Sequence, residues 1–262
     1  MTKRWILVLY LFPAMLLGAG SLPFLFGHLD MEVARNYYNE KAGLWTLSEK
    51  PPWTLLQRFG PVPAIFTAVV GLSVLILGMG RSRLGRYRKL SAFLTLALLI
   101  GPGLVGNILV KSYWERPRPR DVAGLGGSQQ FEPLLNWNPD TAGYAIVNGH
   151  ACMGFYFFAG GLALLACGRR RTGILVLMAA GALGYFMGKA RAVQGEHFLS
   201  ETLWAAGLVW FSSAILFHLL GLHRKALSEP RSPERAELPA WIPFASLVVV
   251  LAAAGTTCLA FP

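Results

Sequence analysis

The sequence has 262 residues, of which 54% are hydrophobic and only 14% are charged, and its formal net charge is +11. A typical soluble domain carries about 25% charged residues, so this composition excludes a water-soluble globule, and its apolar content excludes a disordered chain. A basic excess on so apolar a chain is typical of a membrane protein with cationic loops rather than of a nucleic-acid-binding protein.

Seven apolar stretches are long enough to cross a bilayer, which takes about 20 residues per helix. In chain order they cover residues 5–27, 61–80, 91–110, 146–168, 173–190, 202–221 and 240–260. The first is longer than the roughly 7–15 apolar residues of a secretory signal, so we expect a retained helix. The sequence therefore predicts an all-α, polytopic membrane helical bundle in one domain over 1–262, with core spans within 5–221 and an extra C-terminal span.

Loop charges predict the orientation of the chain. With a cytoplasmic N-terminus, the inner segments hold 14 basic and 3 acidic residues, and the outer segments hold 10 of each. The positive-inside rule requires the basic excess to be cytoplasmic. We therefore predict a multi-pass protein of the bacterial inner membrane, with residues 28–60, 111–145 and 190–201 on the periplasmic side.

The outer segment 28–60 mixes charges with Tyr37, Tyr38, Trp45 and Trp53. Such aromatic residues are enriched at the headgroup level of membrane proteins. The composition fits an interfacial anchor, and it also fits a flap over a lipid site.

The first polar stretch follows the third span. The ten residues 111–120 contain four cations: Lys111, Arg116, Arg118 and Arg120. They lie on the predicted periplasmic side, which is expected to be poor in basic residues. Arginine presents a planar fork that matches phosphate oxygens, and lysine presents a compact point charge. The stretch predicts an anionic partner, the alternative being cations that reach toward lipid headgroups.

The second stretch, Asn148-Gly149-His150, lies at the mouth of the fourth span. A helix that begins there directs unpaired backbone N–H groups and its positive dipole end toward an anion. Gly149 lets a phosphate approach the backbone because it has no Cβ, and Asn148 offers an amide donor. His150 can donate or accept a proton near neutral pH, although a structural role is the alternative.

The third stretch runs from Arg191 through His197 to Glu201, between the fifth and sixth spans. If the sixth span begins near His197, then His197 and Glu201 are four residues apart and share a helix face. The carboxylate can then hold Nδ1 and leave Nε2 to act as a nucleophile or base. An ordinary surface pair is the alternative.

Topology places the three stretches at the same membrane surface. Together they supply two imidazoles, an orienting carboxylate and several cations, without metal-ligand spacing. This set suits in-line phosphoryl transfer through a phospho-histidine, with cations stabilising charge on the phosphoryl oxygens. We therefore expect no metal and no other cofactor.

The pattern Lys-x6-Arg-Pro, then Gly-His opening a helix, then Arg-x5-His-x3-acid resembles the type 2 phosphatidic acid phosphatase (lipid phosphate phosphatase) superfamily. The resemblance implies a six-span core and assigns roles to the matching residues. Phosphate would be held by Lys111, Arg118 and Arg191, and we expect Asn148 and Gly149 at the helix mouth to contribute to its binding. His150 would be the general acid, His197 the nucleophile, and Glu201 the residue that orients His197.

The chain departs from the family pattern in the second and third motifs. The second motif normally reads Pro-Ser-Gly-His, whereas here Val147 and Asn148 precede Gly-His. The third motif normally begins Ser-Arg and ends in Asp, whereas here it begins with Ala190 and ends in Glu201. These departures affect the expected turnover and substrate preference more than the expected fold.

We interpret the sequence as a metal-independent phosphatase that hydrolyses a lipid phosphate or diphosphate at the periplasmic face. Its expected partners are the lipid phosphate substrate and membrane lipids, with no nucleic acid. Two alternatives stay open, namely a lipid-to-lipid phosphotransferase that uses the same site and a non-catalytic lipid-phosphate binder. The single Gly-Pro-Gly break at 101–103 and the lack of a repeat argue against a transporter.

Overall fold

A computed structural model of the chain describes residues 6–26, 28–80, 82–110, 116–136, 143 and 146–225. The predicted span 240–260 and Lys111 lie outside the described residues. In the described part, six helices are long and apolar enough to cross a membrane: Leu7–Phe26, Trp53–Gly80, Arg88–Ile108, Gly149–Ala166, Arg170–Ala192 and Leu199–Leu219. The predicted all-α polytopic membrane bundle is confirmed.

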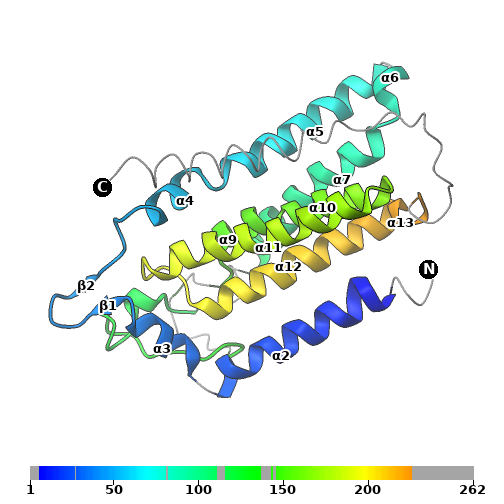
Figure 1. The fold of residues 1–262 in the computed structure, drawn as a ribbon. Coiled ribbons are helices and arrows are strands. Elements are labelled where there is room, and N and C mark those ends of the chain that lie inside the picture. The colour runs from blue at the N-terminus through cyan, green and yellow to red at the C-terminus, as the bar shows by residue number, and fades with distance from the viewer. Residues whose placement is uncertain are drawn as a thin grey trace.

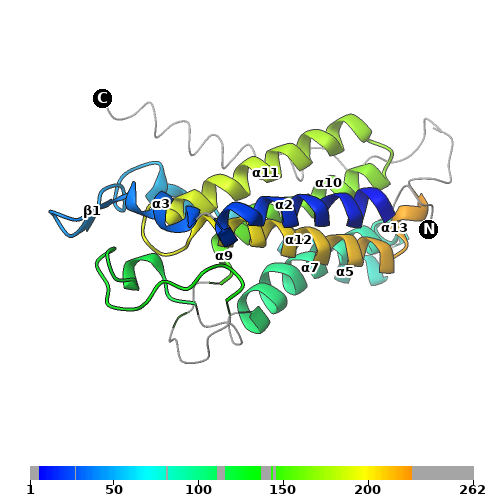
Figure 2. The same ribbon diagram turned by 90° about the horizontal axis from the view of Figure 1, so that it is seen from below.

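The fourth span occupies the centre of the bundle and the first lies at its edge. Of the most apolar window in each, 72% is buried in Gly149–Ala166 but only 17% in Leu7–Phe26. The first span consists of the π-helical η1 (Leu7–Leu11) and α2 (Phe12–Phe26), and α2 packs along α12 (Leu199–Leu219) (Figures 1 and 2). A helix that is apolar all round in this position presents most of its surface to lipid.

Glycines bring the central helices close together. The central span divides into α9 (Gly149–Phe155) and α10 (Phe157–Ala166), and both pack on α11 (Arg170–Ala192). A Cβ added at Gly154 in α9 would lie 2.6 Å from the Cα of Gly184 in α11. Because only glycine allows the two backbones to approach this closely, van der Waals contact between small residues holds the centre.

The second and third spans form a hairpin. α4 (Trp53–Phe59) leads into α5 (Val62–Gly80), followed by the short α6 (Ser82–Gly85) and then α7 (Arg88–Leu98). After α7 the backbone widens into the π-helical η2 (Leu99–Val110), where Asn107 Nδ2 donates to the Pro102 carbonyl at 2.7 Å. This hydrogen bond satisfies a backbone carbonyl in the stretch where Pro102, which has no backbone N–H, interrupts the regular helical hydrogen bonds.

The described spans begin two or three residues away from the expected positions, except the second, which begins eight residues earlier. The second span begins at Trp53 rather than at residue 61, because α4 extends the helical stretch through the polar Gln57 and Arg58. The sixth begins at Leu199 rather than 202, which includes Glu201 in its first turn.

The outer segment 28–60 folds against the end of the bundle that carries the polar stretches. It consists of α3 (Leu29–Arg35), a hairpin of β1 (Tyr38–Asn39) and β2 (Leu44–Trp45), and then α4. The strands are antiparallel, with Tyr38 opposite Trp45. Figure 1 shows α3, β1 and β2 at the end opposite α6 and α13 (Leu222–Lys225), and Figure 2 shows the loop 116–136 at that same end. This loop contains the short η3 (Pro119–Asp121).

Candidate active site

Gly195 is the point where three distant segments meet. It follows α11, has a φ of +70°, and a Cβ there would lie 2.4 Å from the ring of Trp45. Its carbonyl accepts a hydrogen bond from the Arg120 backbone N–H at 3.0 Å. Glycine is therefore required both for the turn and for the contact with the outer segment.

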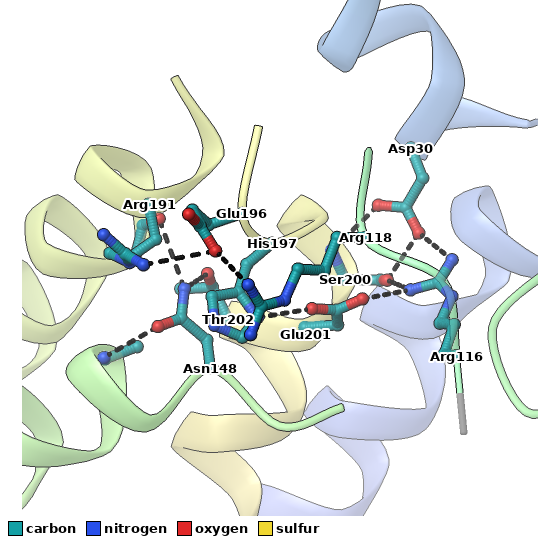
Figure 3. Close-up of polar contacts among 12 residues, drawn as sticks. Asp30, Arg116, Arg118, Asn148, Arg191, Glu196, His197, Ser200, Glu201 and Thr202 are labelled. Carbon is teal, nitrogen blue, oxygen red and sulfur yellow. Dashed lines mark hydrogen bonds and ion pairs between the residues drawn. The ribbon is translucent and has the colours of Figure 1, made fainter. Parts of the chain in front are cut away.

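The structure brings the predicted pair His197 and Glu201 together. His197 Nδ1 lies 2.8 Å from Glu201 Oε2, and both side chains are buried (Figure 3). Because α12 begins at Leu199, Glu201 lies in its first turn and reaches back to His197, which lies two residues before the helix. A carboxylate on Nδ1 fixes the tautomer and the ring orientation, so that the proton of the neutral ring lies on Nδ1.

A buried ion-pair network holds the other oxygen of Glu201. Arg116 Nη1 donates to Glu201 Oε1 at 2.8 Å, and Nη2 donates to Asp30 Oδ2 at 2.9 Å. All three side chains have 0% exposure. We call Asp30, Arg116 and Glu201 the buried network (Figure 3).

Neither Asp30 nor Arg116 could be assigned to this network from the sequence. Arg116 is one of the four cations in the first stretch, where all four were expected to face an anionic partner. In the structure its guanidinium faces two carboxylates of the protein instead.

Three other arginines converge on Glu196, the residue before His197. Arg118 Nη1 lies 2.8 Å and Arg191 Nη2 lies 3.4 Å from Glu196 Oε2, and Arg120 pairs with Oε1. Side-chain exposure is 30% for Arg118, 44% for Arg120, 12% for Arg191 and 13% for Glu196, so solvent reaches the group. We call these four residues the arginine cluster.

Arg191 is fixed by a second set of contacts. Its Nη1 donates to Gln194 Oε1 at 2.7 Å, and Gln194 Nε2 donates in turn to Gln57 Oε1 at 2.7 Å. The buried Nε of Arg191 has no hydrogen-bond partner among the residues that the structure describes. Within the described part of the chain, Arg191 thus has one donor that no protein group uses.

Asn148 lies at the start of α9, where its side chain contacts protein groups. Oδ1 accepts the Ala151 N–H at 3.1 Å, and Nδ2 lies 3.3 Å from both the Gly188 carbonyl and Thr202 Oγ1. The amide that the sequence predicted to donate to phosphate is thus turned toward α11 and α12 (Figure 3).

The same contacts place the start of the helix that carries His150. His150 is half-buried in the first turn of α9, one residue after Gly149. Because Asn148 contacts Thr202 in the first turn of α12, the helix that carries His150 begins beside the helix turn that carries Glu201. The second and third stretches are therefore neighbours in the fold.

An apolar cavity adjoins the buried network. It has a volume of about 250 Å³ and is bordered by α2, α12 and the loop residues before α9. Its lining includes Leu17, Leu134, Val147, Trp204 and Leu208, together with Glu201.

Among the described residues, no group of three or more His, Cys, Asp or Glu is arranged to hold a metal ion.

Comparison with known proteins assigns this arrangement to a family. The PAP2 superfamily matches residues 88–225, which is more than half of the chain and contains all three polar stretches. The chain belongs to the PAP2 superfamily. The predicted membership of the type 2 phosphatidic acid phosphatases is thereby confirmed.

Three curated relatives carry the same description. The chain is 30% identical over 200 residues to a lipid A 4'-phosphatase of Francisella tularensis subsp. novicida (strain U112), covering 75% of this chain and 88% of the relative. A lipid A 4'-phosphatase of Rhizobium etli is 32% identical over 136 residues, which is 52% of this chain and 49% of the relative. Another from Rhizobium leguminosarum is 31% identical over 124 residues, which is 47% of this chain and 50% of the relative.

The family and these relatives support the predicted phosphatase acting on a membrane lipid. No solved structure matches the chain. The PAP2 match begins at α7, so the outer segment with Asp30 lies outside it.

Proposed function

We propose that this PAP2 protein hydrolyses a lipid phosphate or diphosphate at the periplasmic face of the inner membrane, without a metal, through a phospho-histidine intermediate. The observation that carries the proposal is the proximity of two features. His197 has its Nδ1 on a buried carboxylate, and the adjacent residue Glu196 is surrounded by three arginines.

In the first step, His197 Nε2 attacks the phosphorus atom. A P–N bond forms, the P–O bond to the lipid breaks, and the departing oxygen takes a proton from His150. Glu201 accepts the Nδ1–H hydrogen bond and stabilises the positive charge that develops on the imidazole. Arg118 and Arg191, with Lys111, stabilise the negative charge on the phosphoryl oxygens.

In the second step, water replaces the lipid. His150, now neutral, takes a proton from the water, whose oxygen attacks phosphorus as the P–N bond breaks. Inorganic phosphate leaves, and His197 and His150 return to their starting protonation states.

The arginine cluster supports this role for Arg118 and Arg191. The ion pairs of Arg118 and Arg191 with the Glu196 carboxylate support this role, because guanidinium groups arranged around one anion suit a group with several acceptor oxygens. A phosphate group carries more charge than Glu196 and offers more acceptors, so it can take over these donors. The Nε of Arg191, which has no partner among the described residues, adds one further donor.

Topology supports the periplasmic location of the site. The outer segment and the described residues of the polar stretches lie at the end of the bundle opposite α6 and α13 (Figure 1). The basic residues that follow α5 and α12 belong to the segments that the positive-inside rule assigns to the cytoplasm.

For the substrate, we propose a phosphorylated glycolipid of the lipid A type. The relatives named lipid A 4'-phosphatases support this choice, and an apolar cavity beside Glu201 suits an acyl chain better than a soluble metabolite.

The proposal is tested with purified protein in detergent, in the presence of EDTA. Phosphate release is measured from lipid A, phosphatidic acid and a polyprenyl diphosphate, each carrying labelled phosphate. We expect free labelled phosphate from lipid A, and protein-bound label that is absent from His197→Ala. The control is His28→Asn, which removes an exposed imidazole at a left-handed position that asparagine tolerates.

Three outcomes would contradict parts of the proposal. Activity that disappears with EDTA would contradict metal independence. Label that appears in a new lipid would identify a phosphotransferase. Binding of lipid A without turnover, equal in wild type and His197→Ala, would identify a lipid-phosphate binder.

A further inference from the structure

We infer that Asp30 and Arg116 are positioning residues for the proposed reaction, which hold Glu201 so that its second oxygen faces His197. The inference rests on the proposed function, and it adds a contribution from the outer segment, which lies outside the PAP2 match. Asp30 binds Arg116, Arg116 binds Glu201, and Glu201 contacts His197. Asp30 and Arg116 therefore act through Glu201.

Arg116 is held by contacts on each edge of its guanidinium group. Nε donates to the Glu132 carbonyl at 2.9 Å, Nη1 to Ser200 Oγ at 3.1 Å and to Glu201, and Nη2 to Asp30. The guanidinium also lies over the Phe198 ring, 4.4 Å from its centroid. A planar group fixed in this way gives Glu201 Oε1 one defined donor position.

Asp30 connects α3 to the first turn of α12. Its Oδ1 accepts the Ser200 backbone N–H at 2.9 Å, and its Oδ2 accepts hydrogen bonds from Ser200 Oγ and Arg116. The Ser200 N–H is one of the N-terminal donors that a helix cannot satisfy internally. Asp30 therefore fixes both the turn that contains Glu201 and the arginine that binds Glu201.

The charges of the buried network match the proposed chemistry. Two carboxylates and one guanidinium, each with 0% side-chain exposure, have a net charge of −1. When His197 becomes phosphorylated on Nε2 with a proton on Nδ1, its ring carries +1, and the four groups sum to zero. If Asp30 loses its charge, Arg116 neutralises Glu201 alone, and the carboxylate stabilises the cationic ring less strongly.

A purely structural role for the Asp30–Arg116 pair makes a different prediction. In that case the pair would only fasten α3 to the bundle, and its loss would lower stability or protein yield without a specific effect on turnover. A positioning role requires a fall in kcat at nearly constant KM, because Asp30 does not contact the phosphate.

The test compares wild type, Asp30→Asn, Ser200→Ala and the control Glu32→Gln in the lipid phosphatase assay. Asparagine keeps the acceptor for the Ser200 N–H and removes the charge. We expect kcat to fall by about 10- to 100-fold for Asp30→Asn, with KM within about threefold. Ser200→Ala leaves every charge in place and is expected to lower kcat by about threefold. Glu32 is an exposed carboxylate on the same helix, and Glu32→Gln should match wild type.

A double-mutant cycle with Glu201→Gln tests whether Asp30 acts through Glu201. We expect Asp30→Asn to slow Glu201→Gln by less than about threefold, because the group that it positions is already altered. An equal slowing in both backgrounds, or wild-type kcat in Asp30→Asn, would overturn the inference. A wild-type protein that releases no phosphate from any lipid would instead contradict the proposed function.

Discussion

The buried network and the arginine cluster lie next to each other and use the same side-chain chemistry, but they differ in access to solvent. The carboxylates and guanidinium of the buried network have 0% exposure, whereas the side chains of the arginine cluster are 12–44% exposed. A sealed ion pair cannot exchange its partner for a ligand, but a solvated one can. The first group therefore fits positioning, and the second fits anion binding.

The difference in solvent exposure also changes how much each group of ion pairs contributes to stability. Removing one partner of a buried ion pair leaves an uncompensated charge at low dielectric, whereas exposed pairs contribute little to stability. We therefore expect substitutions in the buried network to reduce both folding and activity, and substitutions in the arginine cluster to reduce activity alone. Three substitutions test this contrast, and a fourth, at Asn148, changes a residue outside both groups. They are given from the largest expected effect to the smallest.

Arg116→Ala is expected to have the largest effect, because it leaves Asp30 and Glu201 buried together without a counter-charge. We expect a loss of about 3–5 kcal/mol in stability. Thermal unfolding in detergent measures the change, with Arg120→Ala as the exposed control. Equal midpoints for the two variants would remove the proposed distinction between the groups.

Arg191→Ala is expected to spare the fold and impair the chemistry. Loss of one guanidinium from the transition state should lower kcat/KM by about 10²- to 10³-fold. The unfolding midpoint should change by the equivalent of about 1 kcal/mol or less. Both quantities are measured on the same preparation, and a collapse of the fold with normal specific activity in the remaining protein would assign Arg191 a structural role.

Glu196→Gln removes the carboxylate that occupies the arginine cluster while keeping its shape. Inorganic phosphate should then inhibit about fivefold more strongly, because it no longer competes with an internal anion. The inhibition constant is measured at low and high salt, where screening should reduce the difference. Weaker inhibition than in wild type would mean that Glu196 organises the arginines rather than competing with phosphate.

Asn148→Ser introduces the residue usual in the family and is expected to have the smallest effect. Serine can still cap α9, but it lacks the amide that contacts the Gly188 carbonyl and Thr202. We expect a loss of about 1 kcal/mol in stability with kcat nearly unchanged. A raised KM at unchanged stability would instead support the amide as a phosphate donor, as the sequence suggested.

The sequence predicted the fold well because long apolar runs follow directly from the thickness of the bilayer. It missed the start of the second span at Trp53, because Gln57 and Arg58 resemble loop residues although they lie within α4. Hydropathy cannot distinguish a polar helix end from a polar loop, since the two have the same composition.

Within the site, local spacing predicted only local contacts. The i, i+4 spacing of His197 and Glu201 indicated that the two could pair, and the structure contains the contact. The expected shared helix face is absent, because His197 lies two residues before the start of α12. The sequence could not predict that Arg116 joins the buried network while Arg118 joins the arginine cluster. Neighbouring arginines carry no signal of which one is buried. Asp30 lies 170 residues from its partner Ser200, and only the fold brings them together.

Residues 88–225, which match the PAP2 superfamily, include Arg116 but not its partner Asp30. An excised fragment that begins at α7 would carry a buried guanidinium whose second counter-ion had been left behind. Chimeras between this chain and its relatives should therefore exchange residues 28–60 and 116–136 together, since each segment supplies one partner of the Asp30–Arg116 ion pair.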